Sequence, residues 1–167
     1  MVELLVTYME AVSPAANAPL ARPVPDAVIV RERLGSEAYL KLYTAVGTSL
    51  QWDLRLRMPR AELEAHLAKP STIIFVLRLG GQAVGLCEFD CAGEAEVELV
   101  YFGLVPEAKG RRLGPYLLDF ALRQAWAAHS PRRVWLHTDT NDDPKAQDVY
   151  RRAGFTVFDR RYETFAD

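Results

Sequence analysis

The 167-residue sequence predicts a mixed α/β fold in which helices pack on a mostly antiparallel sheet. Two observations predict this class. Three runs of strand character, residues 72–79, 82–90 and 95–104, follow one another with short connections, as strands do in an antiparallel meander. After residue 104 the hydrophobic period changes, and helical and extended patterns alternate to the end of the chain, which is typical of helices packed on a sheet.

The chain opens with two predicted strands, residues 4–11 and 27–34, because both segments alternate and are rich in β-forming residues. Between them, residues 13–26 contain several prolines and alanines, which exclude a regular element and favour an irregular excursion or a long hairpin arm. We therefore expect the first two strands to form an extended pair.

Two helices are predicted before the meander. Apolar residues recur at intervals of three and four between residues 36 and 46, with Ser36 as the expected N-cap. A shorter helix begins at residue 59 or 60 and ends at Ala68, two residues before a proline.

Helix and strand alternate in the last third of the chain. The predicted elements are a helix over 113–125, a strand over 134–140, a helix over 144–153 ended by Gly154, and a strand over 155–165. Because the first of these helices crosses over the sheet, the strand at 95–104 should run parallel to residues 134–138. Ligands bind preferentially at such a place, where strand ends and helix N-termini meet.

The composition is that of a soluble globular protein, with half of the residues hydrophobic and a quarter charged, and the length suits a single domain over residues 1–167. With 20 Lys and Arg against 22 Asp and Glu, the net charge of -2 provides no global basic field, so no nucleic-acid partner is expected. The N-terminus lacks the pattern of a signal peptide or membrane span, which predicts a cytoplasmic protein without membrane contact.

The two cysteines, Cys87 and Cys91, lie four residues apart within a predicted strand, where neither a disulfide nor a metal site is expected. We interpret them as free thiols in a reducing compartment. His66 and His129 offer no ligand spacing with a cysteine, so no metal is implied.

A turn rich in glycine and basic residues connects the third strand of the meander to the next helix. Its residues are Lys109, Gly110, Arg111, Arg112, Leu113, Gly114 and Pro115. A helix start leaves backbone N–H groups unpaired and carries partial positive charge, so such a turn favours an anion. The glycines allow the backbone to approach a phosphate closely, the three basic side chains add positive charge, and the proline fits a first helical turn. The ligand that we infer is a pyrophosphate. The alternative is that these residues merely begin a surface helix.

Two common phosphate-binding motifs are disfavoured. The turn lacks the Gly-Lys-Ser or Gly-Lys-Thr of a Walker loop. A meander precedes it, without the strand and helix alternation of a doubly wound dinucleotide fold.

The stretch VELVYFGLVPEAKGRRLGPYLL, residues 97–118, resembles the acetyl-CoA-binding core of the GNAT superfamily of N-acetyltransferases. That family carries Gln or Arg, two residues, Gly, one residue, and then Gly or Ala. Lys109 aligns with the Gln or Arg, Arg112 with the first Gly, and Gly114 with the last. Lys109 still supplies a cation, and Arg112 keeps its N–H directed at phosphate if its backbone is helical.

A second stretch, HTDTNDDPKAQDVYRRAGFTVFDRR, is similar to the final helix of the same family. In that helix an Asn precedes the first turn, Ala and Tyr lie on the inner face, and a Gly-Phe pair opens the last strands. The matching residues here are Asn141, Ala146, Tyr150, Gly154 and Phe155.

The resemblance implies a GNAT-like mixed, mostly antiparallel central sheet of about seven strands, with helices on both faces and a splayed parallel pair that forms the acetyl-CoA cleft. Acetyl-CoA would be the co-substrate, without a metal. Its pantetheine arm would lie along the backbone of Gly103, Leu104 and Val105, and its diphosphate on the turn at 109–115. Gly103 suggests a bulge where another chain comes close, the alternative being a packing glycine. The resemblance adds Asn141, Ala146 and Tyr150 to the coenzyme-binding residues.

Two catalytic roles follow from the resemblance. Tyr150 would be the general acid that protonates the departing thiolate, and Glu98 the base that takes a proton from the attacking amine. Glu94, Glu96 and Glu98 alternate with apolar residues and so share one face of their strand. The alternatives are a tyrosine that only packs in the core and a solvated row of glutamates.

Five further residues are expected near the acceptor. Glu88 and Asp90 would join Glu98 in an acidic pocket, and His137 would be a second proton acceptor or a structural hydrogen-bonding group. Trp52 and Arg55 would lie in the acceptor-side loop, although core packing or a surface ion pair would explain them equally well.

The function expected from this resemblance is transfer of the acetyl group of acetyl-CoA to a primary amine, by direct attack in a ternary complex. The acceptor is a small molecule or a peptide. The alternatives are a non-catalytic CoA- or acyl-CoA-binding sensor or assembly module, or an enzyme with a longer acyl group or an oxygen acceptor. Homodimers are common in the resembled family, but no predicted helix presents an interface.

Overall fold

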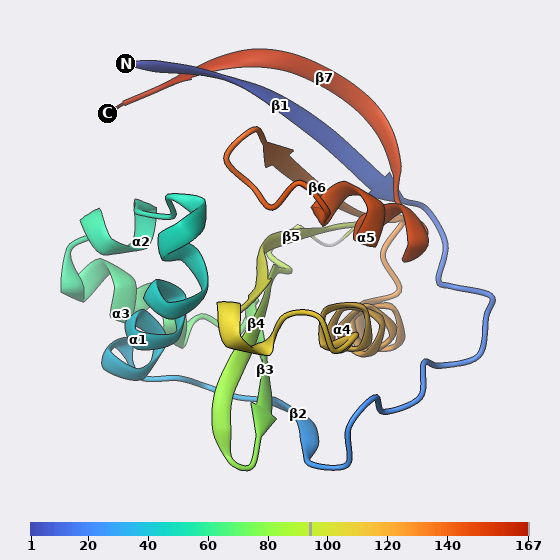
Figure 1. The fold of residues 1–167 in the computed structure, drawn as a ribbon. Helices are drawn as coiled ribbons and strands as arrows, with labels where there is room; N and C mark the ends of the chain where they lie inside the picture. The colour runs from blue at the N-terminus through green and yellow to red at the C-terminus, as the bar shows by residue number, and fades with distance from the viewer. Residues whose placement is uncertain (94, 167) are drawn as a thin grey trace.

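The computed structural model describes residues 1–93 and 95–166, so the expectation for Glu94 lies outside the described residues. Within these residues seven strands form one sheet, in the order β2-β3-β4-β5-β6-β1-β7 (Figure 1). The strands are β1 (Val2–Ala11), β2 (Ala27–Arg31), β3 (Thr72–Leu79), β4 (Gln82–Asp90), β5 (Glu96–Leu104), β6 (Arg133–Asp139) and β7 (Thr156–Phe165). The helices are α1 (Ser36–Gly47), α2 (Leu54–Arg57), α3 (Arg60–Ala68), α4 (Leu113–His129) and α5 (Ala146–Arg152), with short 3₁₀ turns η1 (Thr48–Leu50) and η2 (Pro106–Ala108).

β1 and β2 do not form the extended pair expected from the sequence. β1 lies between β6 and β7 and is antiparallel to both, whereas β2 pairs with β3 at the opposite edge of the sheet. The burial of β1 explains this position: Val6, Thr7 and Met9 are almost inaccessible to solvent, as befits an interior strand that is covered on both faces.

The proline-rich segment between β1 and β2 crosses the outside of α4. The backbone N–H of Leu20 donates to Asp119 Oδ2 (3.1 Å), and the Arg123 guanidinium donates to the carbonyl of Asn17 (2.7 Å). These two bonds fix an irregular and exposed segment to the helix, so the chain passes from the interior strand β1 to the edge strand β2 without forming a hairpin.

α1 begins at Ser36, and Gly35 occupies the N-cap position, so the prediction that Ser36 caps the helix is wrong. The Ser36 hydroxyl instead contacts α3: it donates to Glu64 Oε1 (3.2 Å) and accepts from Arg60 Nη1 (2.9 Å). A side-chain contact between two helices has therefore taken the place of a local cap.

Helices cover both faces of the sheet, as expected. A Cβ atom on Gly103 of β5 would meet Val46 of α1 at 2.6 Å, and one on Gly85 of β4 would meet Leu117 of α4 at 3.1 Å. Gly85 lies opposite Leu104, the neighbour of Gly103, and successive residues of a strand point to opposite faces. α1 therefore packs on one face and α4 on the other, and Figure 1 shows α2 and α3 beside α1.

β5 and β6 form the parallel pair that the crossover through α4 predicts. Glu96, Val97 and Glu98 lie opposite Arg133, Val134 and Trp135, and the ladder between the two strands ends there. β5 nevertheless continues to Leu104 and β6 to Asp139, and the two strands diverge over this length (Figure 1). We call these two diverging segments, residues 99–104 of β5 and 136–139 of β6, the wedge.

Candidate functional site

The wedge has its apex at Glu98, the last residue of β5 that pairs with β6. Two residues further on, β5 contains a bulge, because Leu99 lies opposite Phe89 and Tyr101 opposite Glu88, which leaves Val100 without a partner on β4. Beyond the apex, the edge of β5 that faces β6 makes no ladder with that strand. Backbone polar groups in such an edge are free to bond an extended ligand.

The bulge lies at Val100 and not at Gly103, where the sequence suggested it. Gly103 keeps the regular register, opposite Leu86. The glycine is needed for packing, because a Cβ atom there would come within 2.6 Å of Val46 Cγ1 and would also touch Trp52. Gly103 is therefore a packing glycine beneath α1 that also lies along the wedge.

Replacing Gly103 with alanine is expected to destabilise the protein by about 1–3 kcal/mol, because the added methyl group overpacks the contact with α1. Thermal or urea unfolding measures the change. The matched control is Gly114→Ala, since a Cβ atom there would have its nearest neighbour at 3.7 Å and should cause no loss of stability. Equal stabilities of the Gly103→Ala variant and the parent would contradict this account.

The turn into α4 exposes a row of backbone amides. In the described part of the chain, the N–H groups of residues 110–114 donate to no acceptor, and all but Leu113 and Gly114 are exposed. Gly110 (φ 84°) and Arg112 (φ 62°) are both left-handed. For an arginine this conformation costs about 1–2 kcal/mol, which accounts for a glycine being favoured at that place. Arg112 is thus the N-cap of α4 in a left-handed conformation, so its backbone is not helical as its alignment with the family motif required.

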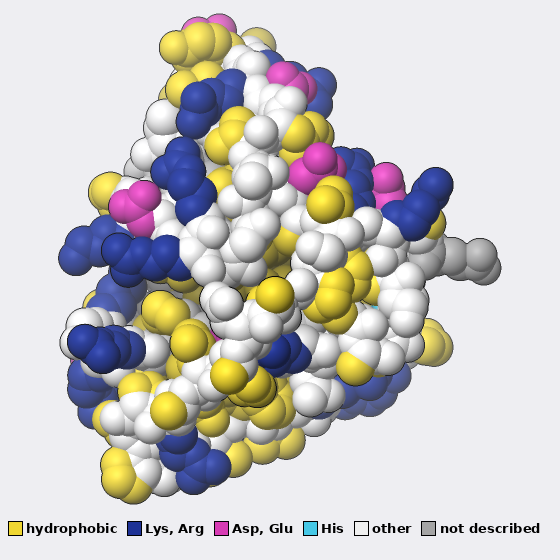
Figure 2. Space-filling model, turned by 90° about the vertical axis from the view of Figure 1, so that its right-hand side faces the viewer, with side chains coloured by type: hydrophobic (Ala, Val, Ile, Leu, Met, Phe, Trp, Pro, Cys, Tyr) yellow, Lys and Arg dark blue, Asp and Glu magenta, His cyan; other side chains and the backbone are white. Residues whose placement is uncertain are grey.

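Basic side chains surround these amides. Lys109, Arg111 and Arg112 are exposed, and Figure 2 shows Lys and Arg side chains gathered along the left margin of the molecule, the side that faces the viewer in Figure 1 and bears the start of α4. Lys109 Nζ forms an ion pair with Asp143 Oδ2 (3.0 Å), which ties the turn to the segment before α5. The side chain of Leu113 is fully buried and anchors the turn.

Tyr150 lies on α5 and is 8% exposed. Its ring lies 5.9 Å from that of Phe102, which together with Leu104 points toward α4, so Tyr150 approaches β5 from the α4 face. The hydroxyl donates to no acceptor in the described residues, and no fully buried polar side-chain atom there lacks a partner, so the oxygen contacts solvent. Burial, followed by the charge of Asp142, raises the pKa of Tyr150 above its usual range, which keeps the phenol protonated.

The remaining coenzyme-binding candidates lie just before α5 and at its start. Asn141 is half-buried in the loop after β6, where its backbone N–H donates to Asp139 Oδ1 (2.8 Å). Ala146 is the first residue of α5, which begins two residues later than predicted because Pro144 and Lys145 form a turn.

Glu98, Asp90 and His137 lie on the face of the sheet opposite to α4. Asp90 is directly opposite Glu98 on β4, and His137 Nε2 lies 3.8 Å from Glu98 Oε1. All three are at least partly accessible. Burial raises the pKa of Glu98 above its ordinary value, the nearby Asp90 raises it further, and His137 opposes the shift. A carboxylate at the apex of the wedge with a raised pKa is suited to accept a proton.

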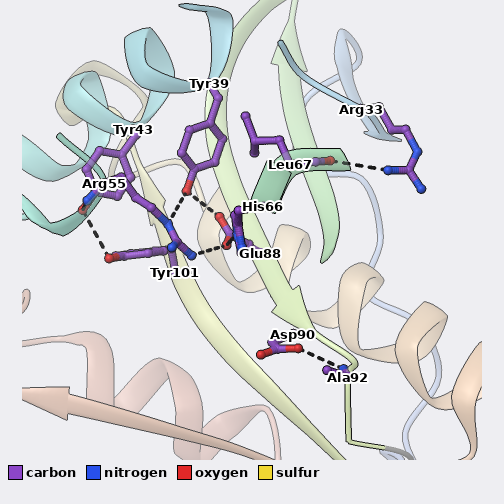
Figure 3. A network of polar contacts seen from close by, with 10 residues as sticks. All are labelled: Arg33, Tyr39, Tyr43, Arg55, His66, Leu67, Glu88, Asp90, Ala92 and Tyr101. Atoms are coloured by element: carbon purple, nitrogen blue, oxygen red, sulfur yellow. Dashed lines mark hydrogen bonds and ion pairs between the residues drawn. The ribbon is translucent and has the colours of Figure 1, made fainter. Parts of the chain in front are cut away.

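Glu88, unlike Asp90, has no exposed surface. Its carboxylate accepts from Arg55 Nη2 (2.8 Å) and from the Tyr39 hydroxyl (2.5 Å), and it contacts His66 Nε2 at 3.0 Å (Figure 3). These contacts hold the pKa of Glu88 below its usual value against the effect of burial. The expectation that Glu88 lines an open acidic pocket does not agree with this position, because helices α1, α2 and α3 cover it.

Arg55 attaches α2 to the sheet through its ion pair with Glu88 of β4. It is the buried residue of that short helix, whereas its neighbours Leu54 and Leu56 are exposed. Beyond its ion pair with Glu88, its backbone N–H donates to the Tyr43 hydroxyl (3.4 Å), and its guanidinium lies 5.3 Å from the ring centre of Tyr101. Arg55 is thus an interior anchor of the loop in which the sequence placed it.

Trp52 spans the open end of the wedge. Its ring packs 4.8 Å from that of Tyr101 on β5, and its side chain lies close to Asp142, which follows β6, where it favours the ionised carboxylate. Asp142 also accepts from the Thr138 hydroxyl and from the Asp139 N–H (3.0 Å). Burial raises the pKa of Asp142, although these three neighbours favour its ionised form.

Sequence reasoning missed several residues of this site. The predicted residues are connected to one another by five others, Tyr39, Tyr43, His66, Tyr101 and Asp142. Only Tyr39 and Tyr43 carried a signal, since their spacing of four places both on one face of the predicted helix.

Within residues 1–93 and 95–166, no three His, Cys, Asp or Glu side chains are grouped so as to hold a metal ion. Among the same residues, no helix is long and apolar enough to span a membrane.

A splayed parallel pair next to an amide-rich helix start defines a class of fold that can hold a long, diphosphate-containing ligand with its end between two strands. The family model of the acetyltransferase (GNAT) family matches residues 38–155, well over half of the chain. The chain therefore belongs to the acetyltransferase (GNAT) family. No curated protein matches the sequence.

Solved structures agree in fold. A functionally unknown conserved protein from Staphylococcus epidermidis has a TM-score of 0.68 at 17% identity, over 96% of this chain and 60% of its own. A GCN5-related N-acetyltransferase from Sphaerobacter thermophilus has a TM-score of 0.63 at 19% identity, over 95% of this chain and 50% of its own. An aminoglycoside acetyltransferase from an uncultured soil metagenomic sample has a TM-score of 0.62 at 17% identity, over 77% of this chain and 87% of its own. The chain thus spans only 50–60% of the first two proteins.

Proposed function

We propose that the chain transfers the acetyl group of acetyl-CoA to a primary amine, by direct attack within a ternary complex. The observation that carries the proposal is the continuity of two features: the free amides of residues 110–114 lie at the start of α4, directly after the strand whose free edge lines the wedge. One elongated molecule with a diphosphate and a thioester fits both. Membership of the GNAT family supports this choice, because that family generally uses acetyl-CoA.

The residues of this chain fit the coenzyme in three parts. The amides at 110–114 and the basic side chains of Lys109, Arg111 and Arg112 suit the diphosphate. The edge of β5 near Gly103 and Leu104, continued by Val105, suits the amide groups of the pantetheine arm, while Asn141 and Ala146 follow β6, the other strand of the wedge. Bound acetyl-CoA supplies the acyl thioester, and the protein supplies alignment and proton transfer.

The bulge takes Val100 out of register with β4 near the apex of the wedge, and we assign to its backbone N–H the stabilisation of negative charge on the thioester oxygen. A regular strand at this point would direct its amide into the ladder with β4. The bulge thus gives β5 a donor that Gly103 does not provide.

Glu98 is the general base in this proposal. It lies at the apex, is accessible from the α1 face, and has a raised pKa, so it accepts the proton of an amine that enters from that side. Asp90 lies opposite Glu98 and favours a positively charged acceptor, and His137 lies beside Glu98 as a second group that can take a proton. Glu88 does not contact the acceptor. Together with Arg55 it positions α2, and with this helix Trp52, which lies two residues before its start.

Tyr150 is the general acid. It reaches β5 from the α4 face, opposite to Glu98, so proton removal and proton donation occur on opposite sides of the wedge. The thiol of CoA and a phenol have ordinary pKa values of roughly 8.5 and 10, and burial raises the pKa of both groups, so a thiolate released beside the buried Tyr150 is itself a stronger base than in water. The raised pKa of Tyr150 ensures that the proton is present at neutral pH.

The test of the proposed function is release of the CoA thiol from acetyl-CoA in the presence of amines: a lysine peptide, a peptide with a free N-terminus, a polyamine and an aminoglycoside. Turnover with at least one amine, and an acetylated product of the expected mass, is the expected result. Binding of CoA without thiol release from any amine would instead indicate the non-catalytic sensor.

Replacing Glu98 with glutamine is expected to lower kcat by at least about 10², because the amine loses its proton acceptor. In the parent, kcat falls as the pH drops through the raised pKa of Glu98. In the variant this acidic limb should move to higher pH, toward the pKa of the amine itself, about 10.4 for a lysine side chain. The pH profile of kcat measures the shift.

The matched control for this prediction is Glu96→Gln, two residues earlier on the same strand, where the carboxylate pairs with Arg133 outside the wedge. Its profile should overlay that of the parent. An acidic limb that stays in place in Glu98→Gln would rule out Glu98 as the base.

A further inference from the structure

A row of aromatic rings crosses the sheet next to Glu98. Trp135 of β6 lies directly opposite Glu98, and Tyr8 of β1 lies directly opposite His137. The ring centres of Trp135 and His137 are 6.4 Å apart. The Tyr8 ring lies 5.8 Å from that of His137 and 6.0 Å from that of Phe158 on β7. Residues that lie opposite one another, or two apart on a strand, share a face, so these rings lie on the face that bears Glu98. We call the rings of Trp135, His137, Tyr8 and Phe158 the aromatic row.

The aromatic row is open to solvent. The side chain of His137 is 48% exposed and Phe158 is 42% exposed, while Trp135 and Tyr8 are half-buried. Within the part of the chain that the structure describes, the hydrophobic core includes neither Trp135 nor Tyr8 nor Phe158. Figure 1 shows β1 and β7 arching clear of α1, α2 and α3, the helices that cover β4 and β5 on this face. Contiguous apolar rings outside the core mark a surface that contacts a ligand.

The charges on this face leave an excess of negative charge only at the apex of the wedge. Three carboxylates on β1 and β7 are already neutralised by arginine. The ion pairs are Arg133 with Glu10 (2.9 Å), and Arg161 with Asp159 (3.5 Å) and Glu163 (3.4 Å). In residues 1–93 and 95–166, neither Glu98 nor Asp90 forms an ion pair with a lysine or arginine. A ligand with one positive charge at the apex therefore suits this face better than a long polycation does.

The two arginines also stack on the aromatic row. The Arg133 guanidinium lies 5.8 Å from the ring centre of Trp135 and 5.0 Å from that of Phe158. The Arg161 guanidinium lies 4.4 Å from the ring centre of Tyr8. Because the neighbouring carboxylates neutralise both charges, these planar groups extend the flat surface of the rings. Such a surface binds another planar ring by stacking.

We propose that the acceptor is an arylalkylamine, whose nitrogen lies at Glu98 and whose aromatic ring rests on the aromatic row. Neighbouring strands are about 4.8 Å apart, so Tyr8, two strands away from Glu98, lies about 10 Å from it across the sheet. A chain of about two or three carbon atoms between nitrogen and ring places the ring over His137 and Tyr8.

This inference rests on the proposed function, because it takes Glu98 as the group that receives the amine. The reaction is unchanged. The amine nitrogen bonds the acetyl carbon and loses a proton to Glu98, while the carbon–sulfur bond breaks and Tyr150 protonates the thiolate. The aromatic row adds the choice of the amine.

The test compares kcat/KM for three amines in the presence of acetyl-CoA. Phenethylamine carries a planar ring, cyclohexylethylamine carries a saturated ring on the same chain, and spermidine carries several charges and no ring. We expect kcat/KM for phenethylamine to exceed that for cyclohexylethylamine by about three- to tenfold, because only the planar ring stacks. It should exceed that for spermidine by at least about tenfold.

Variants of the aromatic row test which residues carry this preference. Tyr8→Leu and Phe158→Leu each remove one ring and should lower the ratio of kcat/KM for phenethylamine to that for cyclohexylethylamine by at least about twofold, mainly through KM. Phe158 is exposed, so its variant should fold even if Tyr8→Leu does not. Tyr8→Phe keeps the ring, loses only the bond to Glu163, and should keep the ratio. The matched control is Phe165→Leu, an exposed phenylalanine at the far end of β7, which should also keep the ratio.

The outcomes separate this inference from the proposed function. Acetylation of the three amines without a preference for phenethylamine, or with a preference for spermidine, would overturn the inference and leave acetyl transfer in place. If no amine were acetylated, amide NMR spectra of the ¹⁵N-labelled protein with CoA and phenethylamine would decide. Changes centred on the aromatic row would then support the aryl site and refute acetyl transfer, whereas a spectrum without changes there would overturn both.

Discussion

Replacing Tyr150 with phenylalanine is expected to lower kcat by about 10² to 10⁴, because the departing thiolate loses its proton donor. The substitution removes one oxygen and leaves the ring in its contacts with Phe102 and Phe155, so folding should be retained. The hydroxyl bonds no other described residue, and for this reason its removal breaks no hydrogen bond of the protein itself. The loss should appear in kcat, whereas the affinity for CoA should change little.

Steady-state kinetics with acetyl-CoA and the best amine measure this effect, and calorimetric titration with CoA measures binding. Tyr162→Phe is the matched control, because this tyrosine is exposed near the C-terminal end of β7. Its kcat should equal that of the parent. A Tyr150→Phe variant with unchanged kcat would assign Tyr150 to packing alone.

Replacing Glu88 with glutamine is expected to destabilise the protein by about 3–5 kcal/mol. The substitution keeps the shape of the side chain but leaves the buried Arg55 guanidinium without a counter-charge. α2 has no other buried side chain, so its attachment to the sheet should loosen, and with it the position of Trp52. Urea unfolding measures the stability. An increased KM for the amine, together with a smaller change in kcat, would show that the acceptor side is affected.

The matched control is Glu32→Gln, which breaks the ion pair with Arg78 near the surface at the same distance of 2.8 Å. Because water screens that pair, its loss should cost at most about 1 kcal/mol. If the two variants were equally stable, the buried network would not be the anchor of α2.

The stability difference at Glu88 should also depend on pH. Its folded-state pKa lies below the unfolded value of about 4.3, so its contribution is present above that value and is lost as the pH falls through the folded pKa. The parent and Glu88→Gln should therefore converge in stability in strong acid and differ fully at neutral pH.

Much of the fold could be predicted from local patterns. The meander, the change of period and the crossover predicted three antiparallel strands and the parallel pair β5–β6, and all of these are confirmed. The partner of β1 could not be predicted, because an alternating apolar strand carries no record of which distant strand it joins. The prediction of the α1 cap failed for a similar reason, since the Ser36 hydroxyl bonds Arg60 of α3, which lies 24 residues later in the chain.

The site was predictable to the extent that its residues lie on one element. The turn at 109–115 combines its amides and charges in a single short segment, so its position at the start of α4 followed from the sequence. The network around Glu88 brings together β4, α1, α2 and α3, and nothing in the spacing of its members indicates that they meet. The same holds for Trp52 and Asp142, which belong to segments 90 residues apart.

The claim that most of this account depends on is that the amides of residues 110–114 and the edges of the wedge hold one coenzyme molecule. Amide NMR spectra of the ¹⁵N-labelled protein, recorded while CoA is added, test it residue by residue. The account predicts saturable changes with one CoA per chain, largest at Gly110 to Gly114 and along residues 99–104 and 136–139. A folded protein whose spectrum stays the same at saturating CoA, or changes only outside these segments, would contradict it.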